Sequence, residues 1–247
     1  MSQITPAARA ALAPGGKLRA GINYGNFILA TKDSTTGESR GVAVDLMREL
    51  ARRLDVPFEI VAYDSVGAMV DAPKTGTWDI AFLGSEPARE REISFTAAYL
   101  EIEATYLVPS GSQLRAVADV DHEGVRVGAP ARANYELYLS RTLQRAKLVQ
   151  AQGGDAAFDL LVKGDVDALA GLRQALVGLA EKLPGSRLLD GRFMAVQQSI
   201  GVPKGRDAGL GYLRAFVEEA KASGVVARAI ERTGARGVSV APPAAVS

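Results

Sequence analysis

A repeated alternation of strand-like and helix-like segments constrains the fold of this chain more than any other feature. Residues 17–22 and 57–63 predict strands, and the near-continuous apolar run of residues 78–83 predicts a strand covered on both faces. Apolar residues recur every three or four positions over residues 42–54, which predicts an amphipathic helix, and residues 66–74 predict a weaker helix. Strands joined by helices predict a parallel sheet with crossover connections.

The same alternation begins again further along the chain. Strands are expected at residues 124–130, 147–151 and 166–172. Each of them is followed by a segment with helical spacing, which places helices at residues 133–146, 153–164 and 173–185. The sequence therefore predicts a second α/β unit after the first.

Two long extended segments, near residues 100–108 and 193–202, are the candidates for connections between the two units. The predicted fold class is therefore α/β, with a first lobe of residues 1–104 and 199–247 and a second lobe, residues 105–198, inserted into it. Two connections form a hinge, and a hinge between α/β lobes encloses a cleft. Ligands of open α/β sheets bind beyond the carboxyl ends of the strands, so the segments that follow the strands are expected to line this cleft.

The two ends of the chain carry weaker signals. Thr5 and Pro6 predict the start of a short helix, and residues 208–234 predict one long closing helix, followed by a loose tail. Arg9 interrupts the apolar stretch near the N-terminus, so we expect no secretory signal sequence there. The location of the protein therefore stays open between the periplasm and the cytoplasm.

Composition excludes several classes of protein. A content of 47% hydrophobic and 23% charged residues is typical of a soluble globular chain, and a net charge of +1 gives no electrostatic basis for binding nucleic acid or an anionic membrane surface. No segment approaches the ~20 apolar residues of a membrane span. The chain has no cysteine and one histidine, His122, which we interpret as a surface loop residue. We therefore expect no metal site, no cofactor and no catalytic triad.

The segments "KLRAGIN", "GVAVDLMRELARRL", "WDIAFLGSEPAREREISFTAAYLEIEATYLVP", "GVRVGAP" and "LLVKGDVDALAG" follow one another in a recognisable order and spacing. Over residues 16–234 the chain resembles the type 2 periplasmic solute-binding proteins of family 3, the polar amino-acid binders of ABC importers. The resemblance implies two lobes, each a mixed sheet flanked by helices, joined by two hinge strands. It also implies a periplasmic monomer that traps a small anionic or amino-acid-like ligand as the lobes close and that has an ABC permease as its partner.

In that family, an arginine shortly after a glycine–hydroxyl turn holds the α-carboxylate of the ligand, and "GSEPAR", residues 84–89, resembles this segment. Arg89 stands at the arginine and Ser85 at a hydroxyl position, while Gly84 and the backbone N–H groups of the turn would complete the shell. The chemistry fits, because a guanidinium offers two parallel N–H donors to a carboxylate. By its pattern alone, Arg89 can equally be a solvated residue at a helix start.

Two positions at which the family has an acid for the ammonium group of the ligand are neutral in this sequence. Asn23 stands at the first of them, and Leu172, shortly before the candidate Gln174, stands at the second. A buried ammonium without acceptors is costly, and Glu86 is the acid that could replace the missing charge. Phe27 is either an aromatic wall against the ligand or a residue of the lobe's core.

The segment "APARANYELYL" leads into a predicted helix, where backbone N–H groups and the helix dipole favour negative charge. Arg132, Asn134 and Tyr135 are therefore further candidates for ligand contacts, although Asn134 can instead cap the helix. If Arg132 faces the cleft, it and Arg89 would close on a ligand with two anionic groups. The hypothesis that follows is a small organic anion rather than a zwitterion.

Two other function classes share this pair of lobes. Cyclohexadienyl dehydratases bind carboxylates on the same fold, but their chemistry requires an acid that protonates a leaving group. Glu86 and Glu136 are the acids that the sequence places near the cleft, and neither has a recognisable catalytic context. Sensor proteins carry an attached DNA-binding or membrane segment, so a free-standing ligand sensor is the form left open here. We expect a binding protein with no catalytic residue.

Overall fold

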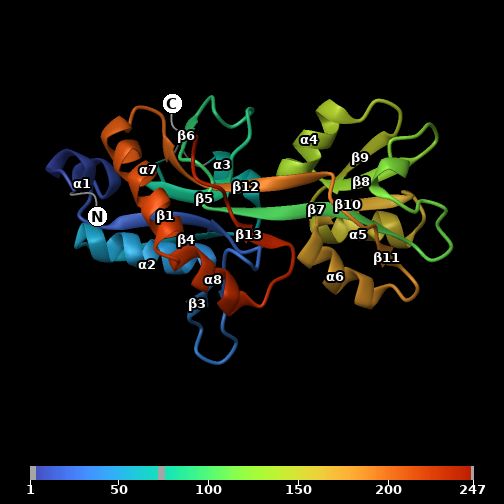
Figure 1. Cartoon of the computed structure of the whole chain (residues 1–247), viewed down its shortest axis with the longest axis horizontal. Helices are drawn as coiled ribbons and strands as arrows, with labels where there is room; N and C mark the ends of the chain where they lie inside the picture. Colours follow the sequence, from blue (N-terminus) through green and yellow to red (C-terminus); the bar gives the residue numbers. More distant parts are fainter. Residues whose placement is uncertain (1–3, 72–75, 246–247) are drawn as a thin grey trace. The chain divides into compact units, whose positions relative to one another are not determined.

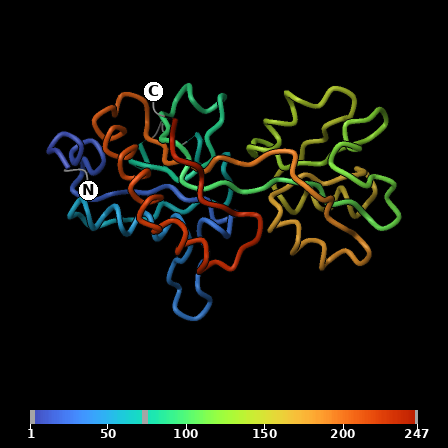
Figure 2. The backbone as a smooth tube through the Cα atoms, viewed as in Figure 1, coloured from blue at the N-terminus to red at the C-terminus, as the bar shows by residue number. Residues whose placement is uncertain are grey.

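The computed structural model describes residues 4–71 and 76–245 (Figure 1). The chain divides into two compact units: unit 1 is formed by residues 1–101 with 197–247, and unit 2 by residues 102–196. The sequence had placed the corresponding boundaries at 104/105 and 198/199. The chain passes between the units in two long strands, β7 (Leu100–Val108) and β12 (Met194–Pro203), which can be followed in Figure 2.

The sheet of unit 1 places its strands in the order β4 (Phe58–Tyr63), β1 (Leu18–Asn23), β5 (Ile80–Gly84) and β12. Strand β1 pairs in parallel with both β4 and β5, which confirms the predicted parallel sheet. Strand β12 is antiparallel to β5 and also pairs with β6 (Ile93–Phe95). All five residues of β5 are buried, as expected for a strand with both faces covered.

The helices of unit 1 follow the predictions at the start of the chain and depart from them at the end. Helix α2 (Val42–Leu54) has the predicted bounds, and Thr5 caps α1 (Pro6–Leu12) by accepting a hydrogen bond from the backbone N–H of Ala8, at 3.1 Å. Helix α3 (Val66–Asp71) begins as predicted, while residues 72–74 lie outside the described residues.

The predicted single closing helix is wrong, because the segment forms two helices, α7 (Asp207–Ala222) and α8 (Val225–Thr233). Gly224 between them has a φ of 74°, a left-handed conformation that glycine adopts without steric cost and that ends the first helix. The expectation of a loose tail is wrong for residues 238–241. Strand β13 (Val238–Val240) pairs with β7, and the backbone N–H of Ala241 donates to the Tyr99 carbonyl at 3.2 Å.

Unit 2 repeats the α/β arrangement with strands in the order β7, β10 (Ala168–Leu172), β8 (Arg126–Pro130) and β9 (Lys147–Ala151). Strand β8 is parallel to both of its neighbours, and β10 is antiparallel to β7. The covering helices are α4 (Asn134–Thr142), α5 (Gly154–Val162) and α6 (Arg173–Lys182). Two short elements, a 3₁₀ turn at Val117–Asp119 and β11 (Arg187–Leu188), were not predicted.

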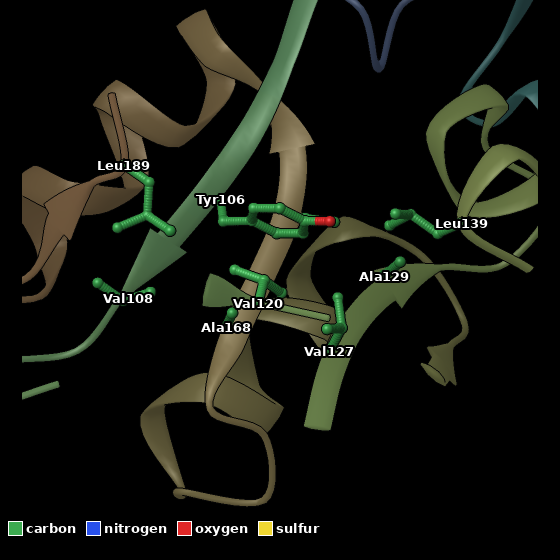
Figure 3. Packing of buried hydrophobic residues seen from close by; sticks show 9 residues of the cluster. Tyr106, Val108, Val120, Val127, Ala129, Leu139, Ala168 and Leu189 are labelled. Carbon is green, nitrogen blue, oxygen red and sulfur yellow. The ribbon is translucent and has the colours of Figure 1, made fainter. Parts of the chain in front are cut away.

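The core of unit 2 gathers around Tyr106 of β7 (Figure 3). Buried aliphatic side chains from β8 and β10, among them Val127 and Ala168, lie next to Val120 and Leu139 in this cluster. The Tyr106 ring stacks on Phe193, with 4.5 Å between the ring centroids. Burial raises the pKa of the Tyr106 hydroxyl. The sheet of unit 2 therefore has its own apolar layer.

An arginine–aspartate pair recurs in both units, and we refer to it as the strand clamp. In unit 1, Arg19 of β1 donates from Nε and Nη2 to the carboxylate of Asp79, at 2.9 Å each, and the Asp79 backbone N–H donates to the Arg19 carbonyl. In unit 2, Arg126 of β8 binds Asp167 in the same way, at 3.1 and 2.9 Å. Each clamp joins the start of one strand to the residue before its parallel neighbour, β5 or β10.

Within the part of the chain that the structure describes, none of the helices is both long and apolar enough to cross a membrane.

Candidate functional site

In unit 1, the candidate residues lie at the carboxyl ends of two neighbouring parallel strands. Asn23 is the last residue of β1 and Gly84 the last of β5, and the register pairs Ile22 with Phe82. The Asn23 Oδ1 atom accepts a hydrogen bond from the backbone N–H of Gly25 at 2.9 Å, so this side chain shapes its own loop. The topology therefore brings Asn23 and the "GSEPAR" turn, residues 84–89, to the same sheet edge.

The "GSEPAR" turn is folded around a buried positive charge. Arg89 is only 3% exposed, and its Nη1 donates to the carbonyl of Gly84 at 2.7 Å. The backbone N–H of Arg89 donates to the Glu86 carbonyl, and that of Ser85 to the Gln197 carbonyl. The interpretation of Arg89 as a solvated residue at a helix start is wrong, because the segment forms turns and its guanidinium is buried. The turn thus holds a fixed cation at the end of β5.

A buried acid shares this turn. Glu86 is 4% exposed and stands three residues before Arg89. A carboxylate is rarely buried unless charged or hydrogen-bonding groups accompany it. The turn therefore holds a guanidinium and a carboxyl group three residues apart, both of them buried.

Sequence reasoning missed the neighbours of this turn on β12. Gln198 pairs with Gly84 in the antiparallel register and is 4% exposed. Its Oε1 atom has no hydrogen-bond partner among the described residues. The signal for this position was the polar pair Gln197–Gln198 in the middle of an otherwise apolar extended segment. Its placement opposite Gly84 depends on long-range strand pairing, which the local pattern does not give.

In unit 2, the candidates again follow parallel strands, β8 and β10. Arg132 is exposed and has a φ of 66°, one of two positive values that the described non-glycine residues show. Its backbone N–H donates to Glu136 Oε2 at 2.8 Å, and Glu136 Oε1 accepts from Gln150 Nε2 at 2.6 Å. Both carboxylate oxygens of Glu136 are thus engaged in holding the entrance to α4, and the residue is 1% exposed.

Asn134 and Tyr135 begin helix α4. The cap residue of this helix is Ala133, which makes no side-chain bond, so the interpretation of Asn134 as the helix cap is wrong. Asn134 is the first helical residue and is 7% exposed. The half-buried Tyr135 ring packs against the core of unit 2, and burial raises the pKa of its hydroxyl.

At the end of β10, Leu172 precedes Arg173 and the half-buried Gln174, the first residues of α6. The Arg173 Nε atom donates to Glu103 Oε2 of β7 at 2.7 Å. Sequence reasoning missed Glu103, because its pairing with Arg173 also arises from strand neighbours far apart in the chain. The basic residue that follows the neutral Leu172 is thus balanced by an acid.

Phe27 lies in the loop that follows β1, four residues after Asn23. Its side chain is 43% exposed, so the interpretation as a core residue is wrong. It lines a pocket of about 580 Å³ together with Arg40, Arg48 and Arg232, and no residue of the turn lines that pocket. The contact of Phe27 with the ligand therefore stays a prediction.

Groups of three or more acidic or histidine side chains that could hold a metal ion do not occur in the described ranges.

Three comparisons relate the chain to known proteins. The family model of the bacterial extracellular solute-binding proteins, family 3, matches residues 18–234. The glutamine-binding protein of an ABC transporter from Bacillus subtilis is 22% identical over 219 residues, which cover 87% of this chain and 80% of that protein.

Two of the solved structures that resemble the chain each cover 91% of it. One is a solute receptor for L-cysteine from Neisseria gonorrhoeae, with a TM-score of 0.76 at 20% identity over 91% of this chain and 92% of that one. The other is an ancestral amino-acid-binding protein described as a precursor of cyclohexadienyl dehydratase, with a TM-score of 0.74 at 21% identity, over 91% of this chain and 97% of that one. Their fold is the two-lobed type 2 fold of periplasmic binding proteins.

Proposed function

Because the chain belongs to the bacterial extracellular solute-binding proteins of family 3, we propose that it captures an amino-acid-like ligand by its carboxylate for an ABC importer. The family is typically periplasmic or extracellular, and we propose the same location here. The relatives named above are binding proteins for glutamine, cysteine or amino acids in general. A permease as the partner and a monomeric state complete this proposal.

The observation that carries the proposal is the buried Arg89 in the turn after β5. Its guanidinium is held at the carboxyl end of a strand by the Gly84 carbonyl, 2.7 Å away, where ligands of open α/β sheets bind. A fixed guanidinium binds a carboxylate through charge-assisted hydrogen bonds, which are stronger than those between neutral groups. The Ser85 hydroxyl and Asn23 are the further unit 1 groups of the proposed site.

The ligand charge depends on Glu86. With Asn23 and Leu172 in the places of acids, Glu86 is the carboxylate that would balance an ammonium group, which favours a zwitterionic amino acid. A small organic anion without an ammonium group is the second candidate, supported by the two neutral positions and by the exposed Arg132. In unit 2, Asn134, Tyr135 and Gln174 are proposed contacts to either ligand. The units would close on the ligand by bending in β7 and β12.

Calorimetric titration with glutamine and with its analogue that lacks the amino group, 4-carbamoylbutanoate, separates the two candidates. An amino-acid binder should take up glutamine, or another amino acid in a screened set, far more tightly than the matching analogue. Replacing Glu86 by glutamine should then weaken the binding of the amino acid and leave the binding of the analogue unchanged. Equal or tighter binding of the analogue would favour the organic anion. A fall in the radius of gyration on ligand addition, measured by X-ray scattering, would test closure.

The role of Arg89 is tested by Arg89→Met, with Arg91→Met as the matched control on an exposed neighbour. Loss of a bidentate charged contact should weaken binding roughly 100-fold in Arg89→Met, while Arg91→Met stays within about two-fold. Circular dichroism checks that Arg89→Met remains folded, and Ser85→Ala gives a milder second test. An affinity within two-fold of wild type in folded Arg89→Met would refute the assignment.

We propose a binding protein rather than an enzyme. Dehydratase chemistry needs an acid that can reach a leaving group. Both oxygens of Glu136 accept structural hydrogen bonds, and Glu86 is proposed above as the partner of the ligand's ammonium group. Prephenate and arogenate should therefore remain unconverted in the presence of the protein, and measurable turnover would favour the enzyme. A free-standing sensor would be distinguished from a transport protein if affinity capture recovered a kinase or regulator instead of a permease.

A further inference from the structure

A pocket on unit 1 carries a set of side chains that the proposed ligand site does not use. It lies where the hairpin of β2 (Thr31–Lys32) and β3 (Ser39–Arg40) meets the N-terminal end of α2 and the C-terminal end of α8. Helix α2 contacts both β3 and α8, and the three elements can be located in Figure 1. We name it the hairpin pocket; its volume of about 580 Å³ falls within the size range of small-molecule sites.

Three arginines from three different elements line the hairpin pocket: Arg40 of β3, Arg48 of α2 and Arg232 of α8. Asp45 lies between two of them, with its carboxylate 2.7 Å from Arg232 Nη2 and 3.7 Å from Arg48 Nη1. Arg48 also donates from Nη2 to the Ser39 carbonyl at 3.0 Å. One carboxylate thus orients two guanidiniums, and together they keep an excess of positive charge.

The third arginine, Arg40, pairs with a different acid, and its side chain is about as exposed as that of Arg232, which is 59% exposed. The Arg40 side chain is 60% exposed and lies 3.3 Å from Asp33, an exposed type of ion pair that contributes little and exchanges readily with solvent. An incoming anion can therefore recruit Arg40 without breaking a buried contact. Guanidinium groups suit this task, because they bind carboxylate and phosphate groups through paired N–H donors.

Phe27 supplies an apolar wall in the same pocket. Among the described residues, four large hydrophobic side chains are exposed, and Phe27 is one of them. A flat apolar group lying on the ring would cover it and gain the contact energy of an aromatic pair. Glu38, the remaining acid of the lining, would repel an anion.

From this arrangement we infer that the hairpin pocket is a second binding site, for a small organic anion with a flat apolar body, such as an aryl carboxylate. The guanidiniums of Arg40, Arg48 and Arg232 bind the acidic group, and Phe27 packs on the apolar body. The inference stands apart from the proposed function, because the pocket shares no residue with the "GSEPAR" turn. It would hold whether or not the protein carries amino acids.

The test uses benzoate as the probe and benzamidine, which has the same shape and the opposite charge, as its control. Nuclear magnetic resonance titration should show saturable shifts of the Phe27 ring and of the Arg48 and Arg232 side-chain N–H signals with benzoate and none with benzamidine. The same shifts should persist when glutamine is present in excess. Shifts with inorganic phosphate of equal size would reveal an anion site without an apolar component and overturn the inference, as would displacement of benzoate by glutamine.

Matched variants locate the site. Arg232→Ala should weaken benzoate binding roughly ten-fold. Arg52→Ala, on the exposed face of α2 and outside the pocket, should change the affinity for benzoate little. Phe27→Ala should weaken it several-fold, and Phe58→Ala, with a similar exposure of 41%, should not. Glu38→Gln should raise the affinity for benzoate, because it removes a negative charge that repels the anion. Weaker binding in Glu38→Gln, or equal effects of the paired variants, would overturn the inference.

Discussion

The strand clamp of unit 1 predicts a large loss of stability when Asp79 is replaced by asparagine. Asp79 is fully buried and receives hydrogen bonds from two guanidiniums, those of Arg19 at 2.9 Å and Arg206 at 3.0 Å. Asparagine keeps the shape but removes the charge, so two partly buried cations lose their counter-ion. Breaking a buried ion pair in this way costs about 3–5 kcal/mol.

The lower end of that range applies here, because the side chains of Arg19 and Arg206 are 33% and 25% exposed and water screens part of their charge. A loss of about 3 kcal/mol lowers the melting temperature of a chain of this size by roughly 6–12 °C. Asp167→Asn is the control, since Asp167 makes the same clamp bonds to Arg126 in unit 2, but with a side chain that is 39% exposed and with one guanidinium in place of two among the described residues. Asp167→Asn should therefore lose much less stability than Asp79→Asn.

The dependence on pH gives the same prediction a second readout. Burial alone would raise the pKa of Asp79, but the hydrogen bonds from Arg19 and Arg206 outweigh it, and the pKa lies below its usual value. A carboxyl whose pKa is lowered by folding stabilises the native state above its unfolded value of about 3.9 and loses that contribution as the pH falls further. The difference between wild type and Asp79→Asn should therefore shrink between pH 7 and pH 3.

Thermal and urea unfolding followed by circular dichroism measure both effects. The reasoning is refuted if Asp79→Asn and Asp167→Asn lose the same stability. It is also refuted if the gap between wild type and Asp79→Asn is as large at pH 3 as at pH 7.

Three further predictions concern single positions. Two arginines bind Glu49 and lower its pKa to about 2, so its contribution to stability is present above about pH 4.3 and is lost as the pH falls toward 2. NMR titration of its carboxyl group should give a midpoint of about pH 2. In Glu49→Gln, stability should fall less steeply as the pH is lowered through this range. Gln198→Leu should raise the melting temperature, because it removes a buried amide oxygen without a partner among the described residues; a lower value would contradict this. Gly41→Ala should cost at least about 3 kcal/mol in urea unfolding, because a Cβ there would lie 2.4 Å from the Leu29 carbonyl oxygen, while Gly37→Ala, with open space around it, should cost about 1 kcal/mol.

Much of the fold could be predicted because local pattern and tertiary structure agree. Helix α2 was found with its bounds, since its apolar stripe is the face that packs on the sheet. The break between α7 and α8 was missed because the apolar spacing continues through Gly224, and only the left-handed conformation of that residue separates the helices. Strand β13 was missed because its three residues acquire their strand from a partner far away in sequence.

The candidate site could be predicted only by position along the chain. The residues that follow β1 and β5 in unit 1, and β8 and β10 in unit 2, were identified because the ends of neighbouring parallel strands meet at one edge of their sheet. Their surroundings could not be predicted, since burial of Arg89, the pairing of Arg173 with Glu103 and the exposure of Phe27 all depend on neighbours that come from other strands. The same holds for Gln198, which lies opposite Gly84 through long-range pairing.

The insertion of unit 2 into unit 1 has a consequence for synthesis on the ribosome. Strand β5 is made early, but its antiparallel partner β12 is completed only after the 95 residues from 102 to 196 have been translated. At ordinary elongation rates this delay is roughly 5–20 s. During that interval the nascent chain presents an apolar strand with one unpaired edge, a form of exposed surface that chaperones recognise and that invites aggregation. Unit 2, in contrast, is one continuous stretch of the chain, residues 102–196.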